Sequence, residues 1–484
     1  MRPSPHYAMP SRSAAGRAAL AATLAVTLTP CLALTDCGGR AARPNVVLIV
    51  VDSLRADALG CYGAQHSASP NLDRLAGEGV RFERAIAQAG WNLPSLSSLV
   101  TSLPPSEHGQ GAAAQPQADA ATLAEALSRG GYRTAAFSEV SWPLLQRGFE
   151  SFTNTAGPHL YGDPQASNAT TTFDAALEWI RGGGQNPFFA LIHTYEVHSY
   201  FMGKPYAHEF ARRENPSYRG RFLEWGIRDT ATPVGPRVIE ALLSADAQDL
   251  AYVQSLYRGA LAAVDGEIGR LVESLKKQKL DGNTVVVVTS PNGEGFRPDL
   301  KRVHHGGRLH DDLLHVPLIV SWPGHAGPAS VRALVESLDV APTTLALAGL
   351  EPEPRFEGQP LLEARTGLWA RLSGPRFVPA AEARQTAFAE ESAMRVAADG
   401  RRETAARRQA ALYAGWVKLI DAGDHVELYD LKADPAEERD QAPSHGEAVA
   451  ALRADLGKVT SGSAVAASND SEVHDQLRSL GYVQ

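Results

Sequence analysis

An unbroken apolar run near the start of the chain most constrains what this sequence can fold into. Val46 to Val51 contains only Val, Leu and Ile, and most of these side chains are branched at Cβ. Such a run is typical of a β-strand that is covered on both faces. The sequence therefore predicts a central strand over Asn45–Val51, buried between two layers of other elements.

Segments along the rest of the chain repeat a strand–helix alternation, which predicts an α/β layered fold. Further strands are expected at 80–86, 133–137, 187–193, 284–289 and 316–321. The longest predicted helix runs from Ala247 to Lys277, with apolar residues along one face. The polar, Pro- and Gly-punctuated stretch from Ser199 to Pro236 predicts an excursion over the surface.

The length and composition of the chain suit one large α/β domain followed by a smaller one. The 484 residues are 44% hydrophobic and 21% charged, which is ordinary for a globular protein. We expect an export segment over 1–43, a large domain over 44–362 and a C-terminal subdomain over 363–484. In the last region, Trp416–Ile420 and Glu427–Leu431 bracket a turn and predict a hairpin.

The first 43 residues resemble a secretory signal. Three arginines precede an uncharged stretch from Ala18 to Leu34 that is rich in Ala, Leu and Thr. Cleavage after Ala33 is one alternative. The other is a lipoprotein-type site before Cys37, although Asp36 departs from the usual small residue. An exported protein is expected, periplasmic or extracellular, with any membrane attachment made through this segment or a lipid on Cys37.

Polar residues follow three of the predicted strands. Asp52 comes directly after the first, His193–His198 after a second and Ser290–Glu294 after a third. Open α/β sheets place their ligands at the carboxyl ends of the strands. Because Asp and Asn oxygens suit a hard divalent cation, Asp52 and Asn292 are candidate metal ligands.

Asn92 begins a predicted helix that follows the strand over 80–86. A helix N-terminus offers free N–H groups to an anion, and a nucleophile placed there would be well activated. An amide is not a nucleophile, and Asn is also among the best N-cap residues. Whether this chain is an enzyme therefore depends largely on this position.

Blocks spread along the chain resemble the sulfatase family, within the alkaline-phosphatase-like superfamily. The resemblance covers nearly the whole chain after the export segment and rests on the order and spacing of the blocks. They are 43–57, 94–109, 305–324, 337–343, 428–437 and 480–482. The resemblance implies a mixed β-sheet between layers of helices, with a smaller C-terminal antiparallel sheet. It also implies sulfate- or phosphate-ester hydrolysis by an ancestor.

In that family a formylglycine made from Cys or Ser attacks the sulfate beside a divalent cation, usually calcium. The resemblance places Asn92 at the nucleophile position, Leu96 at the motif Arg and Pro291 at a metal Asp. No formylglycine is therefore expected. Asp52, with neutral Asn292 and Ser53, should bind calcium only at roughly millimolar affinity.

Two functions follow from these substitutions. The first is a sulfatase-family protein that is catalytically impaired or inactive. The alternative is an active sulfate- or phosphate-ester hydrolase with a rearranged metal site and a water or serine nucleophile, for which Ser95, Ser97 and Ser98 are available.

The resemblance also gives roles to two histidines and a class of ligand. It makes His198 and His305 substrate-binding residues, and it implies a sulfated or phosphorylated small molecule or glycan as the ligand. The spacing of His304 and His305 indicates a zinc site only weakly. A net charge of −8 without long charge runs indicates no nucleic-acid partner.

Overall fold

A computed structural model describes residues 43–109, 120–156, 168–184, 186–227, 234–364, 376–380, 386–396 and 402–460. They belong to a compact unit that runs from Ala42 to Gln484. The expected export segment and the block over 480–482 lie outside the described residues. Among the described helices, none combines the length and the apolar composition that a membrane crossing needs.

The large sheet has eight strands, in the order β10-β2-β9-β6-β1-β5-β3-β4. Its strands are β1 (Asn45–Val51), β2 (Val80–Ile86), β3 (Arg133–Ser138), β4 (Ser151–Asn154), β5 (Phe188–Thr194), β6 (Thr284–Thr289), β9 (His315–Ser321) and β10 (Ala329–Glu336). β1 is parallel to both neighbours, whereas β9 runs antiparallel to β6 and β2. All seven residues of β1 are buried, so the predicted central strand and the mixed sheet are confirmed.

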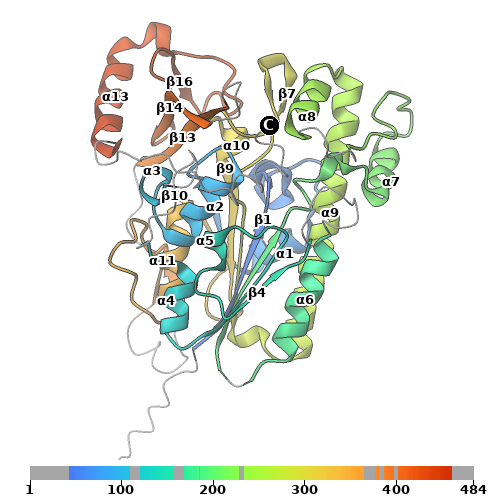
Figure 1. Ribbon diagram of the computed structural model, residues 1–484, viewed down its shortest axis with the longest axis vertical. Helices are drawn as coiled ribbons and strands as arrows, with labels where there is room; N and C mark the ends of the chain where they lie inside the picture. The colour runs from blue at the N-terminus through green and yellow to red at the C-terminus, as the bar shows by residue number, and fades with distance from the viewer. Residues whose placement is uncertain are drawn as a thin grey trace, which may run out of the picture. The chain divides into compact units, whose positions relative to one another are not determined.

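Helices cover both faces of this sheet (Figure 1). One layer contains α2 (Asn92–Thr101), α4 (Leu123–Arg129), α5 (Pro143–Gln146) and α11 (Val340–Leu347). The other contains α1 (Pro70–Glu78), α6 (Ala169–Arg181) and α9 (Ala247–Lys277). The structure also describes α3 (Pro105–His108), α7 (Pro205–Glu214), α8 (Val234–Leu243) and α10 (Asp311–Leu314). The α9 bounds match the predicted amphipathic helix residue for residue.

The predicted surface excursion over 199–236 is wrong at its start. A 3₁₀ turn, η3 (Tyr200–Met202), is buried, with each side chain only 1% exposed. Helix α7 follows and packs on α9, where Ala207 lies against Gly259. The segment thus forms part of the wall beside the strand ends.

A four-stranded antiparallel sheet follows the large one in the chain. It consists of β13 (Thr386–Val396), β14 (Arg402–Ala414), β15 (Val417–Asp421) and β16 (Val426–Asp430), and α13 (Gly446–Thr460) packs against it. The predicted hairpin is β15–β16. β13 adjoins the large sheet, because the Glu390 N–H donates to the Gln88 carbonyl at 2.9 Å. Two-stranded pairs β7–β8 (Phe296–Arg297 and Arg302–Val303) and β11–β12 (Leu362–Ala364 and Phe377–Pro379) complete the strands described.

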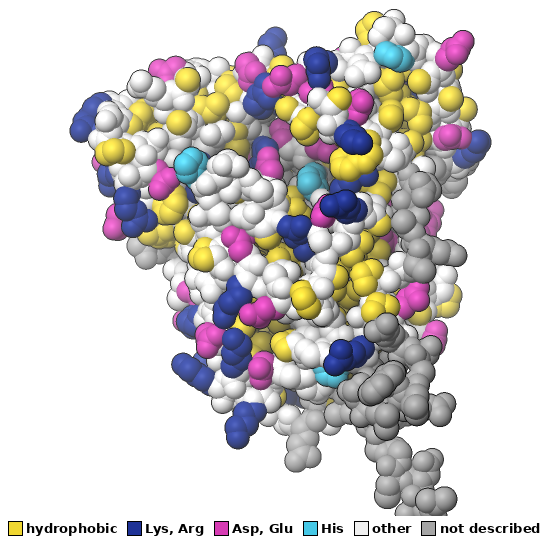
Figure 2. Space-filling model, turned by 180° about the vertical axis from the view of Figure 1, so that it is seen from behind, with side chains coloured by type: hydrophobic (Ala, Val, Ile, Leu, Met, Phe, Trp, Pro, Cys, Tyr) yellow, Lys and Arg dark blue, Asp and Glu magenta, His cyan; other side chains and the backbone are white. Residues whose placement is uncertain are grey.

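Basic and acidic side chains are interspersed over the face that Figure 2 shows. Neither sign dominates that face, so the electrostatic field near it is mixed.

Candidate functional site

The carboxyl ends of β1, β5 and β6 bring the predicted polar residues to one edge of the sheet. The Asp52 N–H donates to the Thr194 carbonyl at 2.9 Å, which continues the pairing of β1 with β5. On the other side, the Leu54 N–H donates to Ser290 Oγ at 3.0 Å. Asp52 therefore lies between the residues that follow β5 and those that follow β6.

Three buried oxygens at this edge make no hydrogen bond within the described part of the chain. They are Asp52 Oδ1, Ser53 Oγ and Asn292 Oδ1, which we call the strand-end oxygens. The second Asp52 oxygen faces His193 Nε2 at 3.3 Å, and the Asn292 amide nitrogen donates to the Gly293 carbonyl at 2.8 Å. An unsatisfied buried oxygen costs about 1–3 kcal/mol, so this edge bears a cost in stability.

The strand-end oxygens do not fit the calcium site that the sulfatase resemblance implies. Calcium takes six to eight oxygen ligands and gains affinity from each carboxylate. Here Asp52 supplies the one carboxylate of the three. Pro291 is buried at the position of the expected metal Asp and has no side-chain ligand to offer.

Asn92 is fixed by hydrogen bonds at both ends of its amide. Its Nδ2 donates to the Tyr195 hydroxyl at 2.6 Å, and its Oδ1 accepts from the Leu93 N–H at 2.9 Å. It is the first residue of α2, whereas the N-cap position belongs to Trp91. The N-cap interpretation is therefore off by one residue, but the side chain still satisfies a free N–H of the first turn.

The serines of α2 are enclosed as well. Ser95, Ser97 and Ser98 are at most 2% exposed. Ser97 donates to the Leu93 carbonyl at 2.7 Å, and Ser98 Oγ lies 2.9 Å from His108 Nε2. The His108 partner of Ser98 is not visible in sequence spacing, since ten residues and a helix end separate the two. Burial lowers the pKa of His108 to about 3, which keeps this imidazole neutral.

Leu96 follows Asn92 by one helical turn and lies on the same face of α2. Leu96, at the position of the motif Arg, is fully buried in the main core. A buried leucine offers no positive charge to an anion, so Leu96 cannot take the part of the motif Arg beside the N–H groups of the first turn.

The predicted substrate histidines lie together. The rings of His198 and His305 have centroids 4.8 Å apart, and His198 is also 4.8 Å from the Tyr195 ring. Burial, followed by the neighbouring His305 and His304, lowers the pKa of His198 well below its ordinary value. A neutral imidazole at this position binds an anion less strongly than a protonated one.

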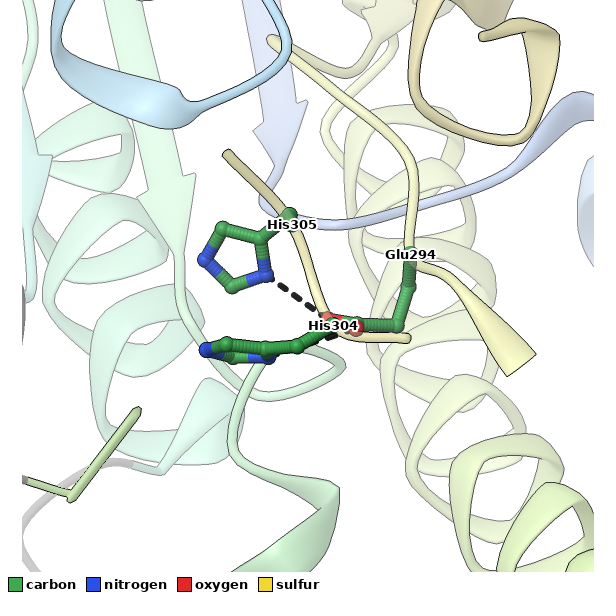
Figure 3. Close-up of side chains that lie close together, drawn as sticks. All are labelled: Glu294, His304 and His305. Atoms are coloured by element: carbon green, nitrogen blue, oxygen red, sulfur yellow. Dashed lines mark hydrogen bonds and ion pairs between the residues drawn. The ribbon is translucent and has the colours of Figure 1, made fainter. Parts of the chain in front are cut away.

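Glu294 joins His304 and His305 in a buried group, which we call the histidine cluster (Figure 3). His305 Nδ1 lies 2.8 Å from one Glu294 oxygen and His304 Nδ1 lies 3.3 Å from the other. One ligand atom from each residue lies within 4.8 Å of the others, so the three could hold a metal ion. Burial alone would raise the pKa of Glu294, but His304 and His305 lower it well below its usual value.

The β7–β8 hairpin is what folds Glu294 back onto the two histidines. The Gly295 N–H donates to the His304 carbonyl at 3.1 Å, and the His304 N–H returns the bond at 3.0 Å. Two-residue strands are too short to predict from periodicity, which is why the sequence left Glu294 outside the site.

A cavity of about 480 Å³ is lined by none of the three residues of the histidine cluster and not by Asn92. Its lining is charged with both signs and includes Arg55, Arg302, Asp311 and Glu437. Arg55 connects the two places, because its guanidinium donates to the Glu294 carbonyl at 2.7 Å. Asp52, Asn92 and Asn292 do not line this cavity, and each is fully buried.

The chain is similar in sequence to sulfatases. The family model described as Sulfatase matches residues 44–350. N-acetylgalactosamine-6-sulfatase of Sus scrofa is 27% identical over 354 residues, which span 66% of this chain and 66% of that protein. N-acetylglucosamine-6-O-sulfatase of Bacteroides thetaiotaomicron is 24% identical, with 82% of each chain covered.

Solved structures agree on the fold. Phosphonate monoester hydrolase of Agrobacterium radiobacter superposes with a TM-score of 0.64 at 22% identity, covering 87% of this chain and 96% of that one. A protein solved with its substrate D-glucosamine-2-N,6-O-disulfate gives a TM-score of 0.65 at 22% identity, covering 86% and 98%. The mixed sheet flanked by helices, with small antiparallel sheets, is the architecture of these neighbours.

Proposed function

The chain belongs to the sulfatase family, and we propose that it is a member that does not catalyse ester hydrolysis. The observation that carries this proposal is the state of Asn92. A non-nucleophilic amide occupies the nucleophile position and is bonded at both ends, to Tyr195 and to the Leu93 N–H. Family chemistry needs an activated nucleophile there.

The metal position supports the same conclusion. A Lewis acid would have to be held by Asp52 and neutral oxygens, because Pro291 contributes no ligand. A weakly held cation stabilises little of the charge that develops in a sulfuryl transfer. Loss of the nucleophile and loss of the metal ligand are separate changes, and each alone is enough to abolish turnover.

Turnover of an aryl sulfate and an aryl phosphate tests the proposal directly. We expect no turnover by the purified protein with calcium, magnesium or zinc added. Catalysis at an ordinary rate of about 1 s⁻¹ or more, retained through further purification, would overturn it. An active sulfatase assayed in parallel shows that the assay works.

Restoring a nucleophile at position 92 tests the loss of the nucleophile apart from the loss of the metal ligand. Asn92→Cys and Asn92→Thr should remain inactive, because Pro291 and Leu96 still replace the metal ligand and the motif Arg. Turnover by either single variant would mean that the metal site is competent. Combining Asn92→Thr with Pro291→Asp is the smallest change that addresses both losses.

The ligand we propose is a sulfated or phosphorylated glycan or small molecule. The support comes from the relatives, which are named for 6-O-sulfated amino sugars. Calorimetric titration with glucosamine-6-sulfate and with glucosamine tests this. Binding of glucosamine-6-sulfate without binding of glucosamine supports the proposal. Equal binding of the two sugars, or no binding of either sugar, contradicts it for this sugar class.

Export is proposed from the first 43 residues. Mass spectrometry of the protein from its native host would distinguish cleavage after Ala33 from a lipid-modified Cys37. An intact N-terminus in the purified protein would contradict both forms of processing.

A further inference from the structure

The histidine cluster brings together three side chains that could hold a metal ion. Its three side chains come from two loops joined by the β7–β8 hairpin, and all are at most 6% exposed. His304 and His305 direct their Nδ1 atoms at different oxygens of the same carboxylate (Figure 3). One ligand atom from each of the three residues lies within 4.8 Å of the other two.

The two histidines differ in how they contact Glu294. The His305–Glu294 contact at 2.8 Å is a hydrogen bond, whereas His304 Nδ1 makes no hydrogen bond within the described residues, despite lying 3.3 Å from the carboxylate. A buried imidazole nitrogen without a hydrogen bond is costly. A bound cation would satisfy it, because a neutral imidazole nitrogen is a good metal ligand.

The spacing and the type of the ligand atoms decide which metal fits. Bonds of about 2.0–2.1 Å at tetrahedral angles put neighbouring ligand atoms about 3.3 Å apart, which is inside the 4.8 Å limit that the three residues satisfy. Two nitrogens and one carboxylate suit zinc and similar transition metals, whereas calcium and magnesium prefer oxygen. We infer that Glu294, His304 and His305 bind one zinc-class transition-metal ion, apart from the strand-end oxygens.

Three protein ligands would leave one coordination position open. The ring of His198 lies 4.8 Å from that of His305 and 6.3 Å from that of His304, so it adjoins the cluster. The ion would add positive charge to the region that the resemblance gives to substrate binding. The inference does not depend on whether the chain hydrolyses an ester.

Zinc titration of the full-length protein tests the inference. The protein is prepared without a histidine tag, stripped with a chelator and titrated with zinc sulfate in a calorimeter. We expect one zinc ion per chain. Glu294→Gln and His304→Gln should each weaken zinc binding by at least about tenfold, since both remove a ligand.

Two matched variants locate the ion. Asp52→Asn alters the strand-end oxygens and should leave zinc affinity unchanged. His310→Gln removes another histidine–glutamate pair, in which Nε2 of the buried His310 lies 2.8 Å from the half-buried Glu427, and should also leave zinc affinity unchanged. Loss of zinc binding in Asp52→Asn with retention in Glu294→Gln would overturn the inference.

Cobalt substitution keeps the inference testable even if a cluster variant fails to fold. Cobalt bound to the wild-type protein by imidazole nitrogens in a four-coordinate site should give an intense visible absorption band. A weak, octahedral-type spectrum would contradict the inference, as would the absence of stoichiometric zinc binding.

Discussion

Two buried polar regions of this molecule are built in opposite ways. At the sheet edge, the strand-end oxygens of Asp52, Ser53 and Asn292 make no hydrogen bond within the described residues. Where the C-terminal sheet meets the large one, Lys418 Nζ lies 2.7 Å from both Asp311 Oδ1 and Glu437 Oε1.

Further hydrogen bonds connect the residues around Lys418 at this interface between the two sheets. The Tyr413 hydroxyl donates to Asp311 Oδ1 at 2.5 Å, and the Asp311 N–H donates to Glu437 Oε2 at 2.6 Å. We call Lys418, Asp311, Glu437 and Tyr413 the interface network. Buried polar groups are normally paired because leaving them unpaired is costly. The difference indicates that the interface network stabilises the fold, whereas the sheet edge carries oxygens whose missing hydrogen bonds cost stability.

Removing the central cation of the interface network should have the largest effect. Lys418→Met would leave the buried Glu437 carboxylate and the half-buried Asp311 carboxylate without their partner, which costs about 3–5 kcal/mol. Chemical denaturation followed by tryptophan fluorescence measures this loss. Lys276→Met is the matched control, because Lys276 pairs with Glu273 on the exposed face of α9. Equal effects of the two variants would remove the distinction between the regions.

Glu391 is predicted to make stability depend on pH. This β13 residue is buried, accepts a hydrogen bond from the Gly307 N–H, and has its pKa raised by burial to about 7. The folded protein therefore holds a proton that the unfolded chain releases near its ordinary value of 4.5. Stability should fall as pH rises from 4.5 to 7, by about 3 kcal/mol in total.

The variant Glu391→Gln should remove that slope. Its unfolding free energy, measured at several pH values, should exceed that of the wild type at pH 7 and converge with it near pH 4.5. Exposed Glu447 on α13 provides the control, and Glu447→Gln should leave the slope in place. A parallel displacement of the Glu391→Gln curve at all pH values would contradict the prediction.

Much of the fold was accessible from the sequence because its main strands are strongly apolar. The run that became β1 and the periodicity that became α9 are long patterns that tertiary contacts do not override. β13 and β14 were missed, since they lie in an Ala- and Arg-rich stretch and Ala has low β-propensity. Tyr200–Met202 was misplaced because turn residues do not reveal whether a loop packs onto the core.

For the candidate site, the sequence predicted individual residues but not the contacts between them. Asp52, Asn92 and Asn292 were found as strand-end or helix-end residues, and sequence could place them at one edge. The Asn92–Tyr195 bond and the Glu294–His305 pair depend on how separate loops fold against each other. No sequence spacing encodes those contacts.

Asn92 is the exception at the sheet edge, because its amide is paired at both ends. Asn92→Ala should therefore cost about 1–3 kcal/mol, since the Leu93 N–H and the Tyr195 hydroxyl both lose a partner. Denaturation of Asn92→Ala, Tyr195→Phe and the double variant measures the coupling between them. Additive effects would show that the 2.6 Å contact contributes nothing to stability.

Ser53 should show the smallest effect, and one of opposite sign. Its backbone has φ of 59°, in the left-handed region that disfavours residues with a Cβ, and its hydroxyl makes no hydrogen bond among the described residues. Ser53→Gly should therefore stabilise the protein by about 1 kcal/mol. Ser102 has a similar φ of 54°, but its hydroxyl donates to the Leu338 carbonyl at 2.7 Å and accepts from the Gly358 N–H at 2.9 Å. Ser102→Gly should consequently destabilise the protein. Thermal unfolding of both variants measures the two shifts in melting temperature. Shifts of the same sign would contradict the contrast between paired and unpaired polar groups.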